Sequence, residues 1–177
     1  MQYVSHYQSP LGGILLAADG AGLTGLWFEG QKYFARGLDS EAAERALPVF
    51  ELACKWLDIY FSRREPDIEV PLHLTGTPFQ NEVWELLRTI PYGNTVTYGE
   101  LTKRLAEKKG LPRMSAQATG GAVGRNPVSI IVPCHRVVGA DGSLTGYAGG
   151  VDKKLKLLEL ERADMRALYI PKHGTAL

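Results

Sequence analysis

The feature that most constrains this chain is an apolar, β-branched run at residues 130–132 that leads directly into Pro133, Cys134 and His135. Such a run predicts a buried strand. Pro133 has no N–H to donate to a strand ladder, so we expect the strand to end there and the chain to turn. Cys134 would then lie at the rim of a cleft, next to an imidazole that can take its proton. A cysteine nucleophile needs that arrangement, because the thiolate is the reactive form.

Three structural explanations compete with a catalytic one. A lone cysteine is most often a small buried hydrophobe. A zinc site needs three or four ligands at suitable spacing, but the chain has only Cys54 and Cys134, and His6, His73 and His173 lie far from Cys134 in sequence. A disulfide is not expected in a chain without a secretory segment. We therefore expect no metal, no cofactor and a free thiol at residue 134.

Composition limits the class of protein. The chain has 177 residues, of which 45% are hydrophobic and 22% charged, as in an ordinary soluble globular protein. Its apolar runs are too short to span a bilayer, and its N-terminus lacks a basic-then-apolar signal pattern. We expect a cytoplasmic protein, since a reducing compartment keeps a free thiol usable.

Charge is distributed unevenly along the chain. Residues 1–70 hold six Lys and Arg against ten Asp and Glu, whereas residues 71–177 hold fourteen against nine. Between Lys103 and Arg136 there are seven basic residues and one acidic residue, Glu107. A polyanion would meet this basic region first. On charge alone, a solvated helical face with no partner is the simpler explanation.

The N-terminal part alternates in a way that predicts strands at residues 2–7, 13–18 and 23–28, joined by turns rich in Gly, Pro and Asp. Residues 41–61 predict a helix that is broken at Pro48 or begins after it. Cys54 falls on the apolar face of this helix and is expected in the core. A short strand at 70–74 completes a small α/β domain over residues 1–75 with a short antiparallel sheet.

Residues 76–177 predict a mostly helical domain. Thr77 can cap a helix from 78 to about 90, Thr97 a second helix, and Ser115 a third over 116–124 that has almost no large side chains. The last two resemble a helix-turn-helix, although their link is longer than usual. A glycine-flanked tyrosine, Tyr147, marks a loop that is either open to a ligand or a plain surface turn. A final helix over 152–162, with Leu155, Leu157 and Leu158 facing inward, places near its end Glu161, which can accept the ring N–H of His135.

Several motifs in order carry a family resemblance. Pro133-Cys134-His135-Arg136 between two apolar runs resembles the active-site signature of the O6-alkylguanine-DNA alkyltransferases, also called methylated-DNA–protein-cysteine methyltransferases. The similarity is strongest over residues 77–161. Further matching motifs are Ser9-Pro10-Leu11-Gly12, Trp27-Phe28-Glu29-Gly30, Pro91-Tyr92-Gly93, Thr97-Tyr98, Gly120-Gly121-Ala122-Val123, Asn126-Pro127, and Gly142 with Gly146-Tyr147 and Gly149-Gly150.

The resemblance implies direct-reversal DNA repair in a single turnover. An alkylated guanine is flipped out of double-stranded DNA, and Cys134 takes the alkyl group and keeps it, acting as a monomer without a cofactor. By the same resemblance His135 is the base, acting through a water, Glu161 orients it, Tyr98 protonates guanine N3, and Asn126 ties the helix-turn-helix to the active-site segment. The implied substrate contacts are the carbonyls of Cys134 and Val137, the amide of Ala148, Tyr147 and Val123. The implied DNA contacts are Thr97, Arg113, Ser115, Gln117, Ala118, Gly121 and Arg125.

Two departures from the family pattern concern DNA binding. Familiar members carry an arginine in the recognition helix that fills the gap left by the flipped base, and counting back from Cys134 places Gln117 there. Gln can hydrogen-bond the orphaned base but lacks charge and reach, and Arg113 and Arg125 are alternatives. The link between Glu107 and Ser115 is also longer. We therefore expect this protein to differ in DNA affinity rather than in alkyl-transfer chemistry. Some members hold a structural zinc in the N-terminal domain, but the cysteines for it are absent here.

Three rival functions remain at this point. A non-catalytic, alkyltransferase-like lesion binder would keep the fold but replace the acceptor cysteine, so Cys134 argues against it. A helix-turn-helix regulator would need more base-reading side chains than residues 116–124 carry. A cysteine hydrolase with Cys134, His135 and Glu161 would turn over repeatedly, whereas an alkyltransferase stops after one equivalent.

Overall fold

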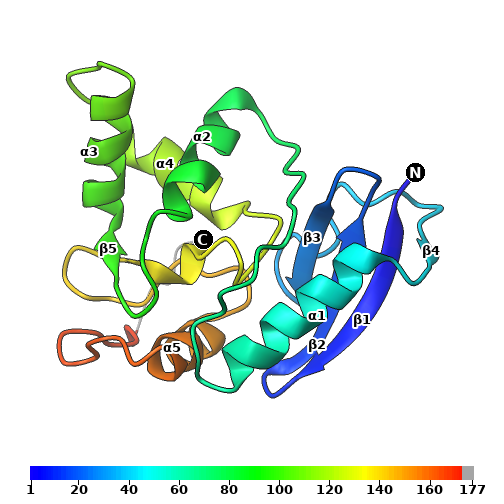
Figure 1. Cartoon of the computed structure of the whole chain (residues 1–177). Coiled ribbons are helices and arrows are strands. Elements are labelled where there is room, and N and C mark those ends of the chain that lie inside the picture. Colours follow the sequence, from blue (N-terminus) through cyan, green and yellow to red (C-terminus); the bar gives the residue numbers. More distant parts are fainter. Residues whose placement is uncertain (173–177) are drawn as a thin grey trace. The chain divides into compact units, whose positions relative to one another are not determined.

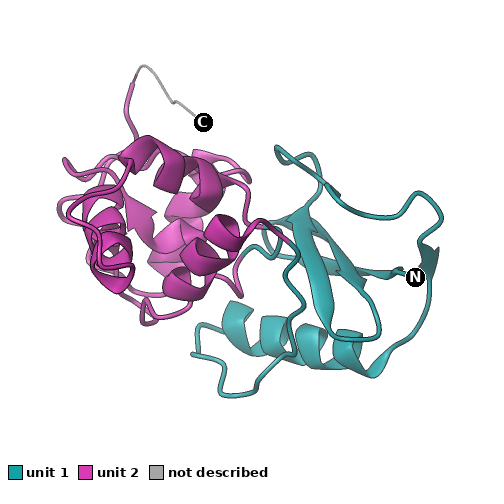
Figure 2. Ribbon diagram, turned by 90° about the horizontal axis from the view of Figure 1, so that it is seen from above, with its two compact units in different colours: residues 1–75, 127–129 teal, residues 76–126, 130–177 magenta. Residues whose placement is uncertain are grey.

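The structure, a computed structural model, describes residues 1–172. The chain divides into two compact units (Figure 2). Unit 1 consists of Met1–Thr75 and the short segment Pro127–Ser129, and unit 2 consists of Gly76–Asn126 and the chain from Ile130 onward. Residues 173–177, at the end of the predicted C-terminal domain, lie outside the described part.

Unit 1 is built on a four-stranded sheet in the order β3-β2-β1-β4 (Figure 1). β1, β2 and β3 are antiparallel neighbours, which confirms the three strands expected from the alternating pattern. The two-residue strand β4 runs parallel to β1. The strands are β1 (Tyr3–Ser9), β2 (Gly12–Ala18), β3 (Leu23–Phe28) and β4 (Ala43–Glu44).

Helix α1 (Pro48–Phe61) covers one face of this sheet (Figure 1). The helix begins at Pro48 rather than being broken there, because the first turn of a helix has no use for the N–H that proline lacks. Its buried side chains are Phe50, Ala53, Leu57 and Tyr60. A second apolar cluster consists of Val4, Leu15, Ala17 and Trp27, with Ala35, Leu38 and Ala42 packed against it.

Two expectations for unit 1 are corrected. Residues 70–74 do not form a strand, because only Leu72 pairs, in an isolated bridge with Leu23. Cys54 is only partly buried rather than part of the core. Its position between two buried residues of α1, Ala53 and Leu57, puts it at the margin of the apolar face.

Within the described part of unit 2, three of the four α-helices begin at the predicted caps. The Thr77 hydroxyl accepts from Gln80 N in a capping box, the Thr97 hydroxyl accepts from Glu100 N, and the Ser115 hydroxyl from Ala118 N. α2 ends a turn earlier than expected, and α2, α3 and α4 pack against one another. The elements are α2 (Pro78–Leu87), β5 (Val96–Thr97), α3 (Tyr98–Lys108), α4 (Ala116–Gly124), the 3-10 turn η1 (Cys134–Arg136), β6 (Val137–Val138) and α5 (Val151–Leu160).

The strand expected at residues 130–132 is absent, and this expectation was wrong. The segment is a turn in which Ile130 has a left-handed φ of 70°. The Asn126 side chain donates to Val132 O at 2.8 Å, which satisfies a buried carbonyl without a strand ladder. Strand pairing begins only at Val137, where β6 lies parallel to β5. The apolar run therefore predicted correctly that the segment is buried, but it did not predict the backbone conformation of the segment.

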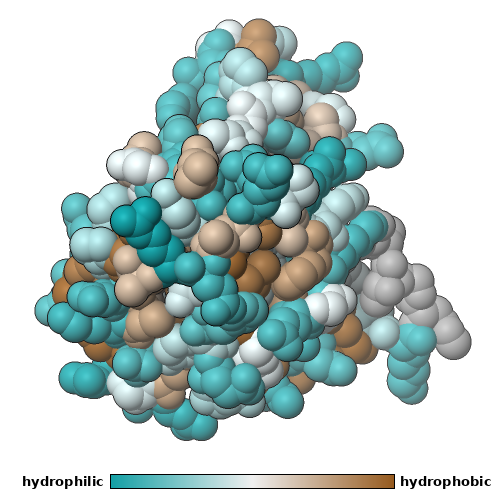
Figure 3. Space-filling view, turned by 90° about the vertical axis from the view of Figure 1, so that its right-hand side faces the viewer, coloured by the Kyte–Doolittle hydropathy of each residue, from teal (hydrophilic) through white to brown (hydrophobic). Residues whose placement is uncertain are grey.

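Among residues 1–172, no helix is both long and apolar enough to cross a membrane. Figure 3 shows a face of the molecule on which hydrophilic side chains surround a smaller group of apolar ones.

Candidate active site

Cys134 is the first residue of η1, and the turn itself presents its thiol. Cys134 N donates to Val132 O at 2.8 Å, and Arg136 N donates to Pro133 O at 3.0 Å. The residue is 7% exposed. Burial raises the pKa of its thiol, while a hydrogen bond from Asn126 and the positive charge of Lys154 act to lower the pKa. The thiol thus lies in a buried site whose polar neighbours favour the thiolate.

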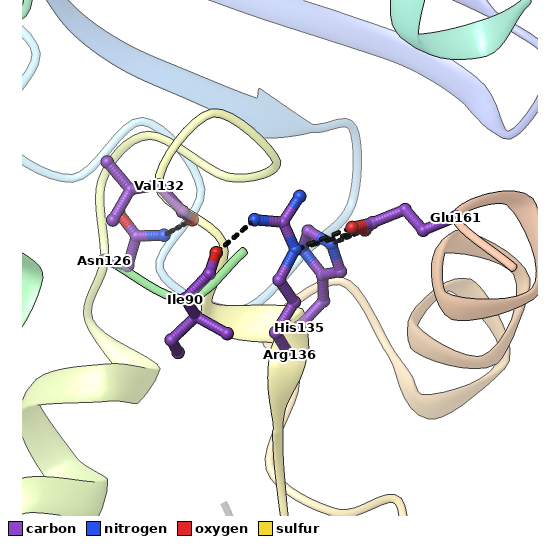
Figure 4. Close-up of polar contacts among 6 residues, drawn as sticks. All are labelled: Ile90, Asn126, Val132, His135, Arg136 and Glu161. Atoms are coloured by element: carbon purple, nitrogen blue, oxygen red, sulfur yellow. Dashed lines mark hydrogen bonds and ion pairs between the residues drawn. The ribbon is translucent and has the colours of Figure 1, made fainter. Parts of the chain in front are cut away.

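His135 and Glu161 form a buried pair 26 positions apart in the sequence (Figure 4). His135 Nε2 lies 2.5 Å from Glu161 Oε2, and both side chains are fully buried. His135 Nδ1 is buried and has no hydrogen-bond partner within the described structure. A neutral imidazole that donates from Nε2 to a carboxylate keeps its lone pair on Nδ1. The geometry therefore leaves a base available at Nδ1.

Electrostatics set the charge states of this pair. Burial lowers the pKa of His135, Glu161 acts to raise it, and the charges of Arg136 and Lys154 lower it further. Burial alone would raise the pKa of Glu161, but His135 and Arg136 outweigh that effect and hold it at about 2. Glu161 is thus ionised and His135 neutral near neutral pH.

Arg136 contacts the same carboxylate of Glu161 as His135 does (Figure 4). Its Nε donates to Glu161 Oε1 at 2.6 Å, and its Nη1 donates to Ile90 O at 2.7 Å. The guanidinium carbon lies 5.7 Å from the centre of the Tyr92 ring. One buried side chain therefore connects the end of α5, η1 and the segment that follows α2.

Lys154 on α5 is a site residue that the sequence analysis missed. Its side chain is fully buried, and its Nζ donates to Val137 O at 2.5 Å and to Thr145 O at 2.7 Å. Burial lowers the pKa of this amine to about 8. A signal did exist, because Lys154 lies three and four positions before the buried Leu157 and Leu158 and so shares their helical face.

The aromatic residues expected at the site are close to it. Tyr98 OH donates to Thr145 O at 3.3 Å, and the Lys154 ammonium lies 5.7 Å from the centre of the Tyr98 ring. Burial and the nearby Cys134 raise the pKa of Tyr98, so its hydroxyl stays protonated. Tyr147 is 2% exposed and meets the His135 ring edge-on, with 6.4 Å between ring centres.

The expected base-binding groups are backbone atoms with capacity to spare. The carbonyl of Val137 already accepts from Lys154, and that of Cys134 accepts from Val137 N. Each carbonyl oxygen has two lone pairs, so each can accept one more hydrogen bond. Ala148 is partly buried in the turn that follows Tyr147, and Val123 is buried in α4.

The expected DNA-binding residues fall into two groups. Five of them border one open cleft of about 530 Å³ beside α4, together with Thr77, Phe79, Gln80 and Ala122. Arg113 instead borders a separate hollow, with Leu111 and Met114, and Thr97 caps α3. The structure thus does not bring Arg113 to the same cleft as Gln117. The five residues of the cleft are Ser115, Gln117, Ala118, Gly121 and Arg125.

In residues 1–172, no group of three His, Cys, Asp or Glu side chains is placed to hold a metal ion.

Comparison with known proteins identifies the family. A family model described as 6-O-methylguanine DNA methyltransferase, ribonuclease-like domain, matches residues 2–74, and one described as the DNA binding domain of the same family matches residues 78–163. Relatives named methylated-DNA–protein-cysteine methyltransferase include one from Haemophilus influenzae (41% identical, covering 90% of this chain and 86% of the relative) and one from Methanosarcina acetivorans (43% identical, 90% and 97%).

Solved structures agree. The crystal structure of Mycobacterium tuberculosis O6-methylguanine methyltransferase is 42% identical, with a TM-score of 0.76 over 92% of this chain and 93% of that one. Mycobacterium tuberculosis OGT in complex with DNA is 40% identical, with a TM-score of 0.78 over 90% and 92%. The resemblance read from the motifs is confirmed: this chain belongs to the 6-O-methylguanine DNA methyltransferase family.

Proposed function

We propose that this protein repairs O6-alkylguanine in double-stranded DNA by transferring the alkyl group, once and irreversibly, to Cys134. The observation that carries the proposal is a buried thiol beside a His135–Glu161 pair, in a chain of this family, with no hydrogen-bond partner for His135 Nδ1 among residues 1–172. Relatives that share more than two fifths of its residues are named for the same transfer. The protein acts as a monomer in the cytoplasm, where its thiol stays reduced.

The chemical step is a displacement at carbon. His135 Nδ1 takes the thiol proton, through a water in the active site, and Glu161 stabilises the imidazolium that forms. The Cys134 sulfur attacks the alkyl carbon as the bond from that carbon to guanine O6 breaks. The electron pair of the broken bond passes into the guanine, and the Tyr98 hydroxyl gives its proton to guanine N3. Guanine leaves neutral, and the new S–C bond has no route to hydrolysis.

Substrate recognition uses the groups around the thiol. The free lone pairs of the Cys134 and Val137 carbonyls accept from the exocyclic amine of guanine, and Ala148 N donates to O6. Tyr147 forms a wall of the pocket. Asn126 holds Val132 O, and therefore fixes η1 relative to the C-terminal end of α4. Lys154 anchors the Val137 and Thr145 carbonyls from behind.

The DNA surface is the cleft beside α4. Its small residues allow close approach in the minor groove, where bulky side chains would meet sugar and phosphate. Ser115, Ala118, Gly121 and Arg125 contact the backbone, and Thr97 and Arg113 extend the surface beyond the cleft. Gln117 is exposed and fills the gap left by the flipped base with an uncharged amide.

Stoichiometry tests the function. Intact-mass spectrometry after incubation with an excess of O6-methylguanine duplex should show a gain of one methyl group per chain, mapped to Cys134 and absent in Cys134→Ala. Cys54→Ala serves as the matched control and should react normally.

Other results would favour a rival. Tight binding of the damaged duplex without a mass gain indicates a lesion-binding protein. Release of more than one equivalent of product indicates a hydrolase. Loss of transfer in Cys54→Ala, with transfer retained in Cys134→Ala, would show that Cys54 and not Cys134 is the acceptor.

A further inference from the structure

Glu161 contacts a second side chain besides the histidine that it orients. The carboxylate is fully buried, and it is contacted by His135 Nε2 at 2.5 Å and by Arg136 Nε at 2.6 Å. Arg136 itself is 8% exposed. A buried arginine is costly to desolvate, so its presence beside a carboxylate that already has a partner calls for a reason.

Charge balance supplies the reason. A buried carboxylate with only a histidine beside it favours the imidazolium, because the pair then has no net charge. An imidazolium cannot accept the thiol proton. With Arg136 in place, the charge of the carboxylate is already balanced by the guanidinium. The imidazolium form of His135 is then no longer favoured by an unbalanced negative charge. The other charged or titratable groups near His135 are Cys134 on η1, Lys154 on α5 and Tyr147 on the loop before α5, and the positive charge of Lys154 acts in the same direction as that of Arg136.

The shape of arginine also contributes. Nε points at Glu161 Oε1 while Nη1 points at Ile90 O, so the planar group is held at both ends. Glu161 Oε2 contacts His135 at 2.5 Å and accepts a longer bond, at 3.4 Å, from Arg136 Nε (Figure 4). Lysine could supply the charge but could not make both bonds in this geometry.

We propose that Arg136 is a positioning residue that neutralises Glu161 and so keeps His135 in the neutral form, with its proton on Nε2 and its lone pair on Nδ1. This inference rests on the proposed function, in which His135 is the base. It assigns to Arg136 a role in the protonation state of the site, separate from any contact with substrate.

The test is the pH dependence of single-turnover methyl transfer in Arg136→Gln, Arg136→Lys and the wild type. Without the guanidinium, His135 holds its proton to higher pH. We therefore expect the rate of Arg136→Gln to begin to fall at a higher pH than the rate of the wild type, by about tenfold for each pH unit below the raised pKa of His135, and to recover as pH rises. Arg136→Lys should keep most of the wild-type pH profile. Arg88→Gln, which removes an exposed ion pair with Glu85, is the control and should match the wild type.

A purely structural role predicts something different. Arg136→Gln would then lose rate equally at every pH, and the proposal would be overturned. If Arg136→Gln does not fold, nitrogen chemical shifts of His135 in the wild type decide: the neutral Nε2-protonated ring near neutral pH supports the proposal, and an imidazolium overturns it. Failure of the wild type to take up a methyl group at any pH would instead count against the proposed function itself.

Discussion

At the scale of single residues, the site combines a thiol, an imidazole, a carboxylate and two cations in the protein interior. Each ionised group is paired or held by backbone carbonyls, which is what makes its burial tolerable. Lys154 shows the principle most clearly. Its ammonium is held by two carbonyls and has no carboxylate partner in the described structure, so its field acts on Cys134 without being cancelled nearby.

Lys154→Met should slow methyl transfer near neutral pH by roughly tenfold or more, the change expected for a rise of one unit or more in the pKa of the Cys134 thiol. The sign follows because the positive charge of Lys154 lowers the pKa of the thiol, so its removal leaves the effect of burial, which raises that pKa, less opposed. Transfer should recover at alkaline pH. Single-turnover rates across pH measure this effect, and Lys156→Met, on the exposed side of α5, is the matched control. A rate loss equal at all pH values would point to lost packing instead.

At the scale of elements, α4 stands out because two of its glycines, Gly120 and Gly121, are not required by the fold. A Cβ on Gly121 would meet only the end of the Arg125 side chain, at 3.4 Å, and a Cβ on Gly120 only Tyr98 Cδ1, at 3.9 Å. Neither residue has a positive φ. Glycine in a helix costs up to about 1 kcal/mol relative to alanine. A helix that keeps such residues without an internal reason is suited to the close approach of another molecule.

Gly121→Ala should raise the free energy of unfolding by up to about 1 kcal/mol and yet weaken binding to duplex DNA. The added methyl group lies in the cleft that we assign to DNA. Urea unfolding and a duplex-binding titration measure the two effects. Transfer from the free base O6-methylguanine, which needs no duplex contact, should be unchanged. Unchanged duplex affinity would place the DNA elsewhere.

Gln117→Arg should tighten duplex binding and steepen its salt dependence by about one released counterion. The added charge lies on the exposed face of α4, where the family pattern has arginine. Affinity measured over a range of salt concentrations tests this prediction. Gln8→Arg, on an exposed position of β1, adds the same charge to unit 1 and should have a smaller effect. Equal effects of the two substitutions would mean that net charge alone matters.

At the scale of the whole molecule, the buried site links folding stability to pH. The pKa of His135 is lowered in the folded state from its usual 6.5, so the unfolded chain binds a proton more readily as pH falls past that value. Glu161 adds to this at lower pH, because its pKa falls from 4.5 to about 2 on folding. His135 therefore stabilises the folded protein fully above pH 6.5 and Glu161 fully above pH 4.5, and each contribution is lost as the pH falls below these values.

We expect the free energy of unfolding to fall as pH drops below 6.5, and more steeply below 4.5. The contribution of Glu161 to this loss is about 3 kcal/mol, the equivalent of its pKa shift. Urea unfolding at a series of pH values measures the slope. Glu161→Gln should be less stable at neutral pH and show a flatter curve in acid. An equally steep curve in that variant would assign the acid sensitivity to exposed carboxylates.

The sequence alone determined much of the architecture, because its strongest signals are local. The capping residues Thr77, Thr97 and Ser115 mark helix starts within a single turn, and alternating side chains mark the three antiparallel strands. The motif around Cys134, together with the other motifs that follow in order along the chain, identified the family. Helix ends and the short strand at 70–74 were less well determined, since they depend on neighbours distant in sequence.

Only the tertiary structure decided how the site is charged and shaped. Residues 130–132 form a turn in which Val132 O accepts from the Asn126 side chain and from Cys134 N instead of from a neighbouring strand. Lys154 is buried because two carbonyls surround its ammonium, and Glu161 meets His135 and Arg136 because α5 returns to η1. Desolvation and long-range pairing are properties of the packed chain, so a local pattern of residues can indicate a buried position but does not fix the charge state of the group there.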